Sequence, residues 1–281
     1  MPALPRRARA VRPWARRVAG LVLSARPGYQ LAVPLFSRIF NFEQAKVSQM
    51  EQRLNNRYTP GAAFPLQAWL VTGSNEWSAQ VRDISGNGIA LLVDAAARPA
   101  AGTPARVRLA VGDYQQAIPA RIIQVRESGR SSLCGIGLQF EDFPALKSYL
   151  QLLQPIAIGQ SLQPVAAERV VQNEPQFTKL IFRGEEGSVL TVWLQKTAGT
   201  PLHSFEFEMQ DYFCRAVAGA GQLEAYTLEA DNSHKGKFKT PVRDSSGELE
   251  AEIRQLFRWI LPNLAPSVPQ DVRGFLQNFA G

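Results

Sequence analysis

The stretch EWSAQVRDISGNGIALLV, residues 76–93, sets the fold of the first half of this chain. Its two ends, EWSAQVRDI and GIALLV, are rich in apolar and β-branched residues and have the length of strands. Gly86 and Asn87 stand between them, and these residue types are typical of tight turns. The stretch therefore predicts two strands joined by a short turn.

Four similar runs surround this pair, and turn-forming residues separate them. They are FPLQAWLV at residues 64–71, PARVRLAV at 104–111, QQAIPARIIQV at 115–125 and SLCGIGLQF at 132–140. Short strands with regular turns are typical of a barrel or a sandwich. A helix is predicted at Pro144–Leu153, with Asp142 as its cap, because its leucines lie on one face.

The second half of the chain has a related pattern. Five β-rich runs predict an antiparallel meander, and the segment at 234–247, HKGKFKTPVRDSSG, is expected to be a charged loop. ELEAEIRQLFRWIL at 248–261 predicts a helix with Ser246 as a cap, and PQDVRGFLQNF at 269–279 a last helical piece. The five runs are FTKLIFR (177–183), SVLTVWLQ (188–195), HSFEFEMQ (203–210), YFCRAVA (212–218) and QLEAYTLE (222–229).

These patterns predict a mostly β fold, α+β overall. A six-stranded antiparallel β-barrel with a C-terminal helix is followed by a second antiparallel sheet domain closed by a C-terminal helix. The expected parts are a basic extension at 1–44, the barrel unit with an N-terminal loop at 45–153, a linker at 154–175 and an α+β domain of unknown role at 176–281.

The net charge of +7 is concentrated at the N-terminus. Residues 1–42 contain eight arginines and no acid, which leaves −1 for residues 43–281. Because the body is near-neutral, specific nucleic-acid binding is not expected. Three interpretations of the tail stay open: a disordered or docking extension, an amphipathic helix on a membrane surface or a partner, and a signal peptide. Its apolar residues fall at helical spacing: Val11, Trp14, Ala15, Val18 and Val22.

Two short motifs carry the functional signal. Arg53 and Arg57 stand four apart in an irregular, asparagine-containing segment before the first strand. The sequence DISGNG, which holds Asp83, Ser85 and Gly88, begins 26 residues after Arg57. Taken alone, the DISGNG sequence is best explained as an ordinary turn, and the arginine pair is consistent with solvated side chains before a strand.

Together the motifs resemble the PilZ domain, a family of bacterial receptors for cyclic di-GMP. The family pattern is RxxxR followed some 20–30 residues later by [DN]xSxxG, here RLNNR and DISGNG. The flanking stretches DISGNGIALLV and ARIIQVRES…CGIGLQFEDF also resemble the family's strands, so the resemblance covers about residues 48–153. No family is recognised in residues 170–281.

The resemblance implies that Arg53, Arg57, Asp83, Ser85 and Gly88 bind cyclic di-GMP. An arginine can present its planar fork to guanine O6 and N7, stack on a purine or pair with a phosphate. The aspartate carboxylate can accept from the guanine N1–H and N2–H₂ edge. The serine adds a hydroxyl, and the glycine lets the backbone approach the ligand closely. Whether one or two ligand molecules bind stays open.

The expected function is therefore a second-messenger receptor that relays cyclic di-GMP to its second domain or to a protein partner. The alternatives are a PilZ-like adaptor that binds proteins without nucleotide, and a nucleic-acid or membrane-surface binder acting through the tail. No catalytic residue, metal site or catalytic cofactor is predicted. Cys134 and Cys214 form no paired or metal-binding spacing, and His203 and His234 have no metal-binding context. A cytoplasmic location is expected, and the alternative is a cytoplasmic protein that contacts the membrane through its tail.

Overall fold

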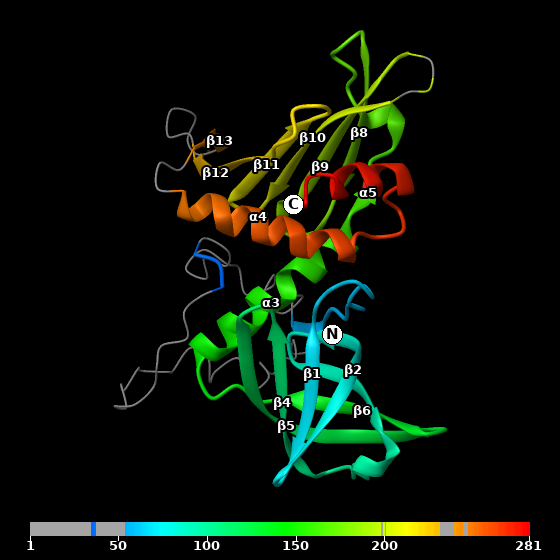
Figure 1. The fold of residues 1–281 in the computed structure, drawn as a ribbon, viewed down its shortest axis with the longest axis vertical. Coiled ribbons are helices and arrows are strands. Elements are labelled where there is room, and N and C mark those ends of the chain that lie inside the picture. The colour runs from blue at the N-terminus through cyan, green and yellow to red at the C-terminus, as the bar shows by residue number, and fades with distance from the viewer. Residues whose placement is uncertain (1–34, 38–53, 198, 200, 231–238, 244–246) are drawn as a thin grey trace, which may run out of the picture.

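The computed structural model describes residues 35–37, 54–197, 199, 201–230, 239–243 and 247–281. The first half is a closed barrel in the order β1-β2-β3-β6-β5-β4, with antiparallel neighbours (Figure 1). The predicted six-stranded antiparallel barrel is confirmed. Its elements are β1 (Gln67–Thr72), β2 (Asn75–Ser85), β3 (Gly88–Asp94), the 3-10 turn η1 (Ala95–Ala97), β4 (Pro104–Val111), β5 (Tyr114–Ser128) and β6 (Ser131–Leu138).

Alternation of side chains along β3 explains how this strand lies in the barrel. Ile89, Leu91 and Val93 are at most 1% exposed and fill the interior. The residues between them face outward, because successive side chains of a strand point to opposite faces. Ser85 pairs with Gly88, so a two-residue turn joins β2 to β3. The strand–turn–strand prediction for residues 76–93 is confirmed.

Helix α3 (Phe143–Ser161) follows the barrel and begins where the sequence predicts. The Asp142 carboxylate accepts a hydrogen bond from the backbone N–H of Ala145 at 2.8 Å, which confirms the predicted cap. Figure 1 shows the helix running from the barrel towards the second sheet. It therefore connects the two halves of the molecule physically.

The end of α3 differs from the prediction. The helix does not stop near Leu153 but continues through Pro155, so residues 154–161 of the expected linker are helical. A proline inside a helix removes one backbone hydrogen bond and normally ends or bends the helix. Here residues 148–159 are all buried. This tertiary burial offsets the proline, which the sequence pattern alone could not indicate.

The second half contains a seven-stranded antiparallel sheet in the order β13-β12-β11-β10-β9-β8-β7. The predicted second antiparallel sheet is confirmed, and neighbours in the sheet follow chain order. The sequence does not predict the two short edge strands, which fall in the expected linker and in the expected charged loop. The strands are β7 (Gln163–Pro164), β8 (Phe177–Arg183), β9 (Val189–Gln195), β10 (Leu202–Met209), β11 (Tyr212–Val217), β12 (Glu224–Ala230) and β13 (Lys239–Val242).

Two helices cover one face of this sheet. α4 (Glu248–Ile260) contacts β11 and β12, and α5 (Gln270–Gln277) contacts β10. Both predicted C-terminal helices are confirmed. The predicted cap Ser246 lies outside the described residues, and Gly247 at the cap position makes no side-chain cap bond. Three further 3-10 turns are η2 (Ala167–Arg169), η3 (Glu185–Gly187) and η5 (Leu261–Asn263).

The two halves pack closely against each other. Their buried apolar residues form one continuous cluster. A Cβ atom on Gly61 would lie 1.8 Å from the carbonyl oxygen of Pro262, and one on Gly159 would lie 2.7 Å from the carbonyl carbon of Asn263. Contacts this short between a Cβ and backbone atoms are not tolerated. Glycine at both positions therefore permits the close approach of η5 to the first half.

Residues 35–37 of the N-terminal extension lie against this joint. Phe36 is 1% exposed, and its ring centroid lies 5.8 Å from that of Trp259. Gln151 of α3 accepts from the N–H of Leu35 at 2.8 Å and donates to the carbonyl of Phe36 at 2.7 Å. The predicted apolar stripe of the tail lies outside the described residues. None of the described helices has both the length and the apolar character needed to cross a membrane.

Candidate functional site

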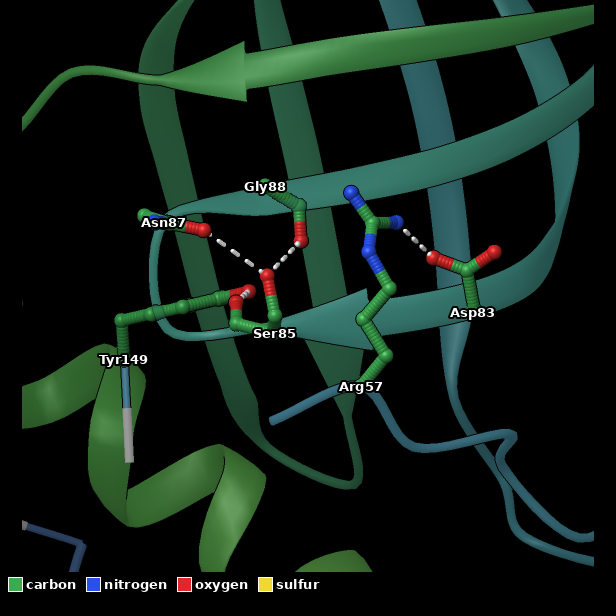
Figure 2. A network of polar contacts seen from close by, with 6 residues as sticks. All are labelled: Arg57, Asp83, Ser85, Asn87, Gly88 and Tyr149. Atoms are coloured by element: carbon green, nitrogen blue, oxygen red, sulfur yellow. Dashed lines mark hydrogen bonds and ion pairs between the residues drawn. The ribbon is translucent and has the colours of Figure 1, made fainter. Parts of the chain in front are cut away.

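The turn between β2 and β3 is held by polar contacts from within the barrel half. The Ser85 hydroxyl lies 3.0 Å from Asn87 Oδ1 and 3.1 Å from the Gly88 carbonyl oxygen, and it can donate to either (Figure 2). The hydroxyl of Tyr149, on α3, donates to the Ser85 carbonyl at 2.6 Å. Burial raises the pKa of Tyr149, so its hydroxyl stays protonated as this donor. Ser85 itself is 1% exposed, and the turn is therefore a preformed part of the barrel.

Arg57 lies beside Asp83 because the residues that follow them in the chain are paired. Tyr58 and Ile84 exchange both backbone hydrogen bonds at 2.8 Å. The Nη1 group of Arg57 donates to Oδ1 of Asp83, and Figure 2 shows the arginine extending towards the carboxylate on β2. The two side chains are 61% and 33% exposed. An exposed ion pair contributes only about 0–1 kcal/mol, so both groups can exchange partners at low cost.

The outer face of the barrel next to Asp83 is made of small residues. Strand register sets Asp83 opposite Ala90, and Ala90 opposite Gly135. In the adjacent row Gly88 lies opposite Gly137. Directly paired residues of antiparallel strands share a face. We call Gly88, Ala90, Gly135 and Gly137 the small-residue floor, since none of the four contributes a bulky side chain beside the carboxylate.

Strand β5 borders this floor on the far side. Arg121 pairs with Gly137, and Gln124 pairs with Gly135. A Cβ on Gly135 would lie 2.7 Å from Cγ of Gln124, so the glutamine side chain lies over this glycine. Arg121 Nη1 donates to the carbonyl of Gly102 at 2.8 Å. The floor is thus bounded by a carboxylate on β2 and, on β5, by polar side chains together with the exposed apolar side chain of Ile123.

Comparison with known families identifies the first half. The sequence model of the PilZ domain family matches residues 51–154. Residues 51–154 are a PilZ domain. The match agrees with the resemblance at about residues 48–153 and ends inside α3, so the second sheet lies beyond it.

No curated protein matches the chain. Two solved structures are similar to it at low sequence identity. An uncharacterized Legionella protein, Lpg0364, is 15% identical, with 35% of this chain and 88% of that chain covered and a TM-score of 0.25. The Borreliella burgdorferi PlzA protein in complex with c-di-GMP is 11% identical, with 73% and 94% covered and a TM-score of 0.30. The assignment of the PilZ domain accordingly rests on the family match.

Four of the five predicted site residues come together on this PilZ domain: Arg57, Asp83, Ser85 and Gly88. Arg53 lies outside the described residues, so its position stays a prediction. The Ser85 hydroxyl is partnered inside the turn, and its direct contact with a ligand also stays a prediction. A Cβ on Gly88 would lie 3.0 Å from the carbonyl oxygen of Ile136, so this glycine permits the close packing of β3 on β6.

Sequence reasoning missed two groups of residues around the candidate site. The small-residue floor is apparent only from strand register, although the alternation in CGIG is a usable signal for it. Glu185 of the second half also contacts the arginine segment: it accepts from the Tyr58 hydroxyl at 2.6 Å and from Asn56 Nδ2 at 2.9 Å. Glu185 follows Tyr58 by 127 residues, and nothing in the sequence pairs them.

Other candidate chemistry is weak in the described part of the chain. No group of three His, Cys, Asp or Glu residues there could hold a metal ion. His203 stacks on Phe177 with ring centroids 4.5 Å apart, and His234 lies outside the described residues. Cys134 and Cys214 are both buried free cysteines, as expected for small apolar core residues.

Proposed function

We propose that this protein is a receptor for cyclic di-GMP, which binds between the arginine segment and the outer face of the PilZ barrel. One observation carries the proposal: Arg57 and Asp83, from motifs 26 residues apart, stand side by side at the edge of the small-residue floor. Arg53 is assigned to the same ligand through the sequence motif. The proposal is for binding and includes no catalytic step.

The chemistry of the two side chains suits this ligand. Cyclic di-GMP carries two phosphates and two guanines. The guanidinium of Arg57 can form a forked contact with guanine or a charge-assisted bond with phosphate. The carboxylate of Asp83 can accept from the N1–H and N2–H₂ edge of guanine. Since the Arg57–Asp83 pair is largely exposed, opening it for the ligand costs little.

The small-residue floor supports a planar ligand. With glycine or alanine at positions 88, 90, 135 and 137, the floor contributes no long side chain of its own between a purine ring and the sheet backbone. For a ring to use the whole floor, Gln124 would have to turn away from Gly135 and Ile123 from Gly137. Ser85 and Gly88 then act mainly by shaping the turn that presents Asp83.

We further propose that binding is relayed to the second half of the chain or, through it, to a protein partner. The continuous core and the buried helix α3 give the PilZ domain a rigid connection to the second sheet. A receptor whose two halves are packed in this way can transmit a change at the binding segment as a change in their contact.

Isothermal titration of the full chain tests the receptor function. We expect saturable binding of cyclic di-GMP and, because a good bidentate base contact discriminates by about 1–3 kcal/mol, at least ~10-fold weaker binding of cyclic di-AMP. Equal affinity for both would contradict guanine recognition by Arg57 and Asp83. A wild-type chain that binds neither nucleotide would instead favour the adaptor without nucleotide.

A further inference from the structure

The arginine segment is held on both sides of Arg57 by one residue of the second half. Asn56 precedes Arg57 and donates to Oε1 of Glu185 at 2.9 Å. Tyr58 follows Arg57 and donates to Oε2 of the same carboxylate at 2.6 Å. A single carboxylate therefore fixes both chain neighbours of the arginine that the proposed site uses.

The corner that carries Glu185 is itself firmly held. Its backbone N–H donates to the Ser161 hydroxyl at 2.8 Å, and that hydroxyl donates to the carbonyl of Ile158 at 3.1 Å. A Cβ on Gly184 would lie 2.7 Å from Ser161 Oγ, so this glycine lets the corner press against the end of α3. The carboxylate is thus positioned by the helix that also supports the turn through Tyr149.

Glu186, which follows Glu185, adopts an unfavourable backbone conformation in this corner. Glu186 has a φ of 59°, a left-handed conformation that non-glycine residues rarely adopt. Its carboxylate accepts from Gln154 of α3 at 3.1 Å and from Gln210, which also has a positive φ. Such conformations persist where surrounding contacts hold them, and they are frequent at functional and switching segments.

The contact between Tyr58 and Glu185 is mostly shielded from water. Tyr58 is 6% exposed, and burial together with the hydrogen bond to Glu185 raises its pKa. The phenol therefore stays protonated and remains a donor at neutral pH. A bond from a buried phenol to a carboxylate is charge-assisted and stronger than a neutral one. Moving the segment away from Glu185 leaves both partners without this bond.

We propose that Glu185 is a positioning residue for the cyclic di-GMP site, which holds Arg57 in place through Asn56 and Tyr58 and so couples ligand binding to the contact between the two halves. This inference rests on the proposed function. Glu185 does not touch the ligand; it reduces the freedom of the segment before binding. By reciprocity, a ligand that fixes Arg57 stabilises the corner at residues 184–188.

The test uses full-length variants. Glu185→Ala removes both hydrogen bonds, and we expect roughly 3- to 30-fold weaker binding of cyclic di-GMP, the usual range for residues that modulate coupling. Tyr58→Phe removes one bond and keeps the ring packing, so its loss should be smaller. Glu185→Gln retains an acceptor and should recover part of the affinity. Glu224→Gln removes a carboxylate that pairs with Arg215 on the second sheet and should bind like wild type.

A second measurement separates positioning from simple stabilisation. Hydrogen exchange across residues 182–189 should slow when cyclic di-GMP is added to wild type and should not respond in Glu185→Ala. Thermal unfolding of each variant checks the fold. If Glu185→Ala does not fold, the affinities of Glu185→Gln and Tyr58→Phe for cyclic di-GMP decide whether Glu185 positions the arginine segment.

The outcomes are distinguishable. A wild-type chain that does not bind cyclic di-GMP overturns the proposed function, and this inference with it. Wild-type binding together with unchanged affinity in folded Glu185→Ala, Glu185→Gln and Tyr58→Phe variants overturns the inference alone. Tighter binding in these variants would also overturn it, because the contact would then oppose the ligand.

Discussion

The two halves of the proposed site are held in different ways. The turn from Asp83 to Gly88 is fixed from within the barrel half, where the hydroxyl and the carbonyl of Ser85 both have partners and Tyr149 supports the turn from α3. The arginine segment is joined to the barrel through the Tyr58–Ile84 bridge and to the second sheet through Glu185. One half of the site is thus a fixed surface, and the position of the other depends on a contact outside the barrel.

This difference indicates where a ligand can produce a change. Satisfied buried polar groups are costly to disturb, so the turn should keep its shape when a ligand arrives. The arginine segment has exposed side chains at Asn55, Arg57 and Thr59, and segments of this kind belong to the less stable parts of a fold. Under the proposed function, selectivity for guanine would therefore have a rigid component at Asp83 and a movable one at Arg57.

The largest expected effect comes from the movable half. Arg57→Ala removes a charge, a planar fork and a stacking surface. A charge-assisted hydrogen bond contributes about 1.5–3 kcal/mol, so we expect at least ~10- to 100-fold weaker binding of cyclic di-GMP by isothermal titration. Arg53→Ala should behave similarly, and Arg57→Lys should recover little if base recognition dominates.

The matched control is Arg130→Ala, which removes the same charge from the β5–β6 hairpin at the far end of β6 from Gly137. It should leave the affinity unchanged. If the Arg53→Ala/Arg57→Ala double variant bound as tightly as wild type, the ligand site would have to lie elsewhere.

The next effect tests the rigid half. Asp83→Ala removes the carboxylate that we propose accepts from the guanine edge, and we expect binding to weaken by roughly 30-fold, or about 2 kcal/mol, with most of the preference over cyclic di-AMP lost. The fold should be unchanged, because the side chain is one-third exposed and its ion pair with Arg57 is a surface pair. Retained selectivity in a folded variant would remove Asp83 from base recognition.

A smaller effect should appear in stability and hardly in affinity. Tyr149→Phe removes the hydroxyl that supports the Ser85 carbonyl, and we expect the free energy of unfolding to fall by about 1–2 kcal/mol. Urea unfolding followed by circular dichroism measures this change. A fully stable variant would mean that the turn does not depend on α3.

The smallest effect is expected for Ser85→Ala. The hydroxyl is bonded within the turn, so its loss should cost on the order of 1 kcal/mol of stability, and affinity should fall by no more than about fivefold. Urea unfolding and isothermal titration of the same sample measure the loss of stability and the loss of affinity, respectively. A loss of affinity as large as that of Arg57→Ala would mean that Ser85 bonds the ligand directly.

Much of the barrel could be predicted from the sequence because the strand patterns and the turn residues there indicate the same structure. Residues 76–93 combine strand-like ends with a Gly-Asn turn, and the structure pairs Ser85 with Gly88 across it. The site residues came from the two motifs, whose order fits the family. Strand pairing then explains why Asp83 and Arg57 meet, since both precede the Tyr58–Ile84 bridge.

The remainder depends on contacts between distant segments. Pro155 indicates the end of a helix locally, but residues 148–159 are buried and α3 continues to Ser161. The edge strands Gln163–Pro164 and Lys239–Val242 are too short to have a pattern of their own. The hydrogen bond between Glu185 and Tyr58 joins the arginine segment of the first half to a loop of the second half. No periodicity or spacing in the sequence indicates such a contact.

Hydrogen exchange of the full chain with and without cyclic di-GMP tests the central claim most directly. The account predicts that exchange across residues 54–58 slows when the ligand is added, because the ligand restrains the segment further, while residues 83–88 change little, because the turn is already formed. Unchanged exchange at 54–58 under conditions where titration shows saturation would contradict the claim that the arginine segment binds this nucleotide.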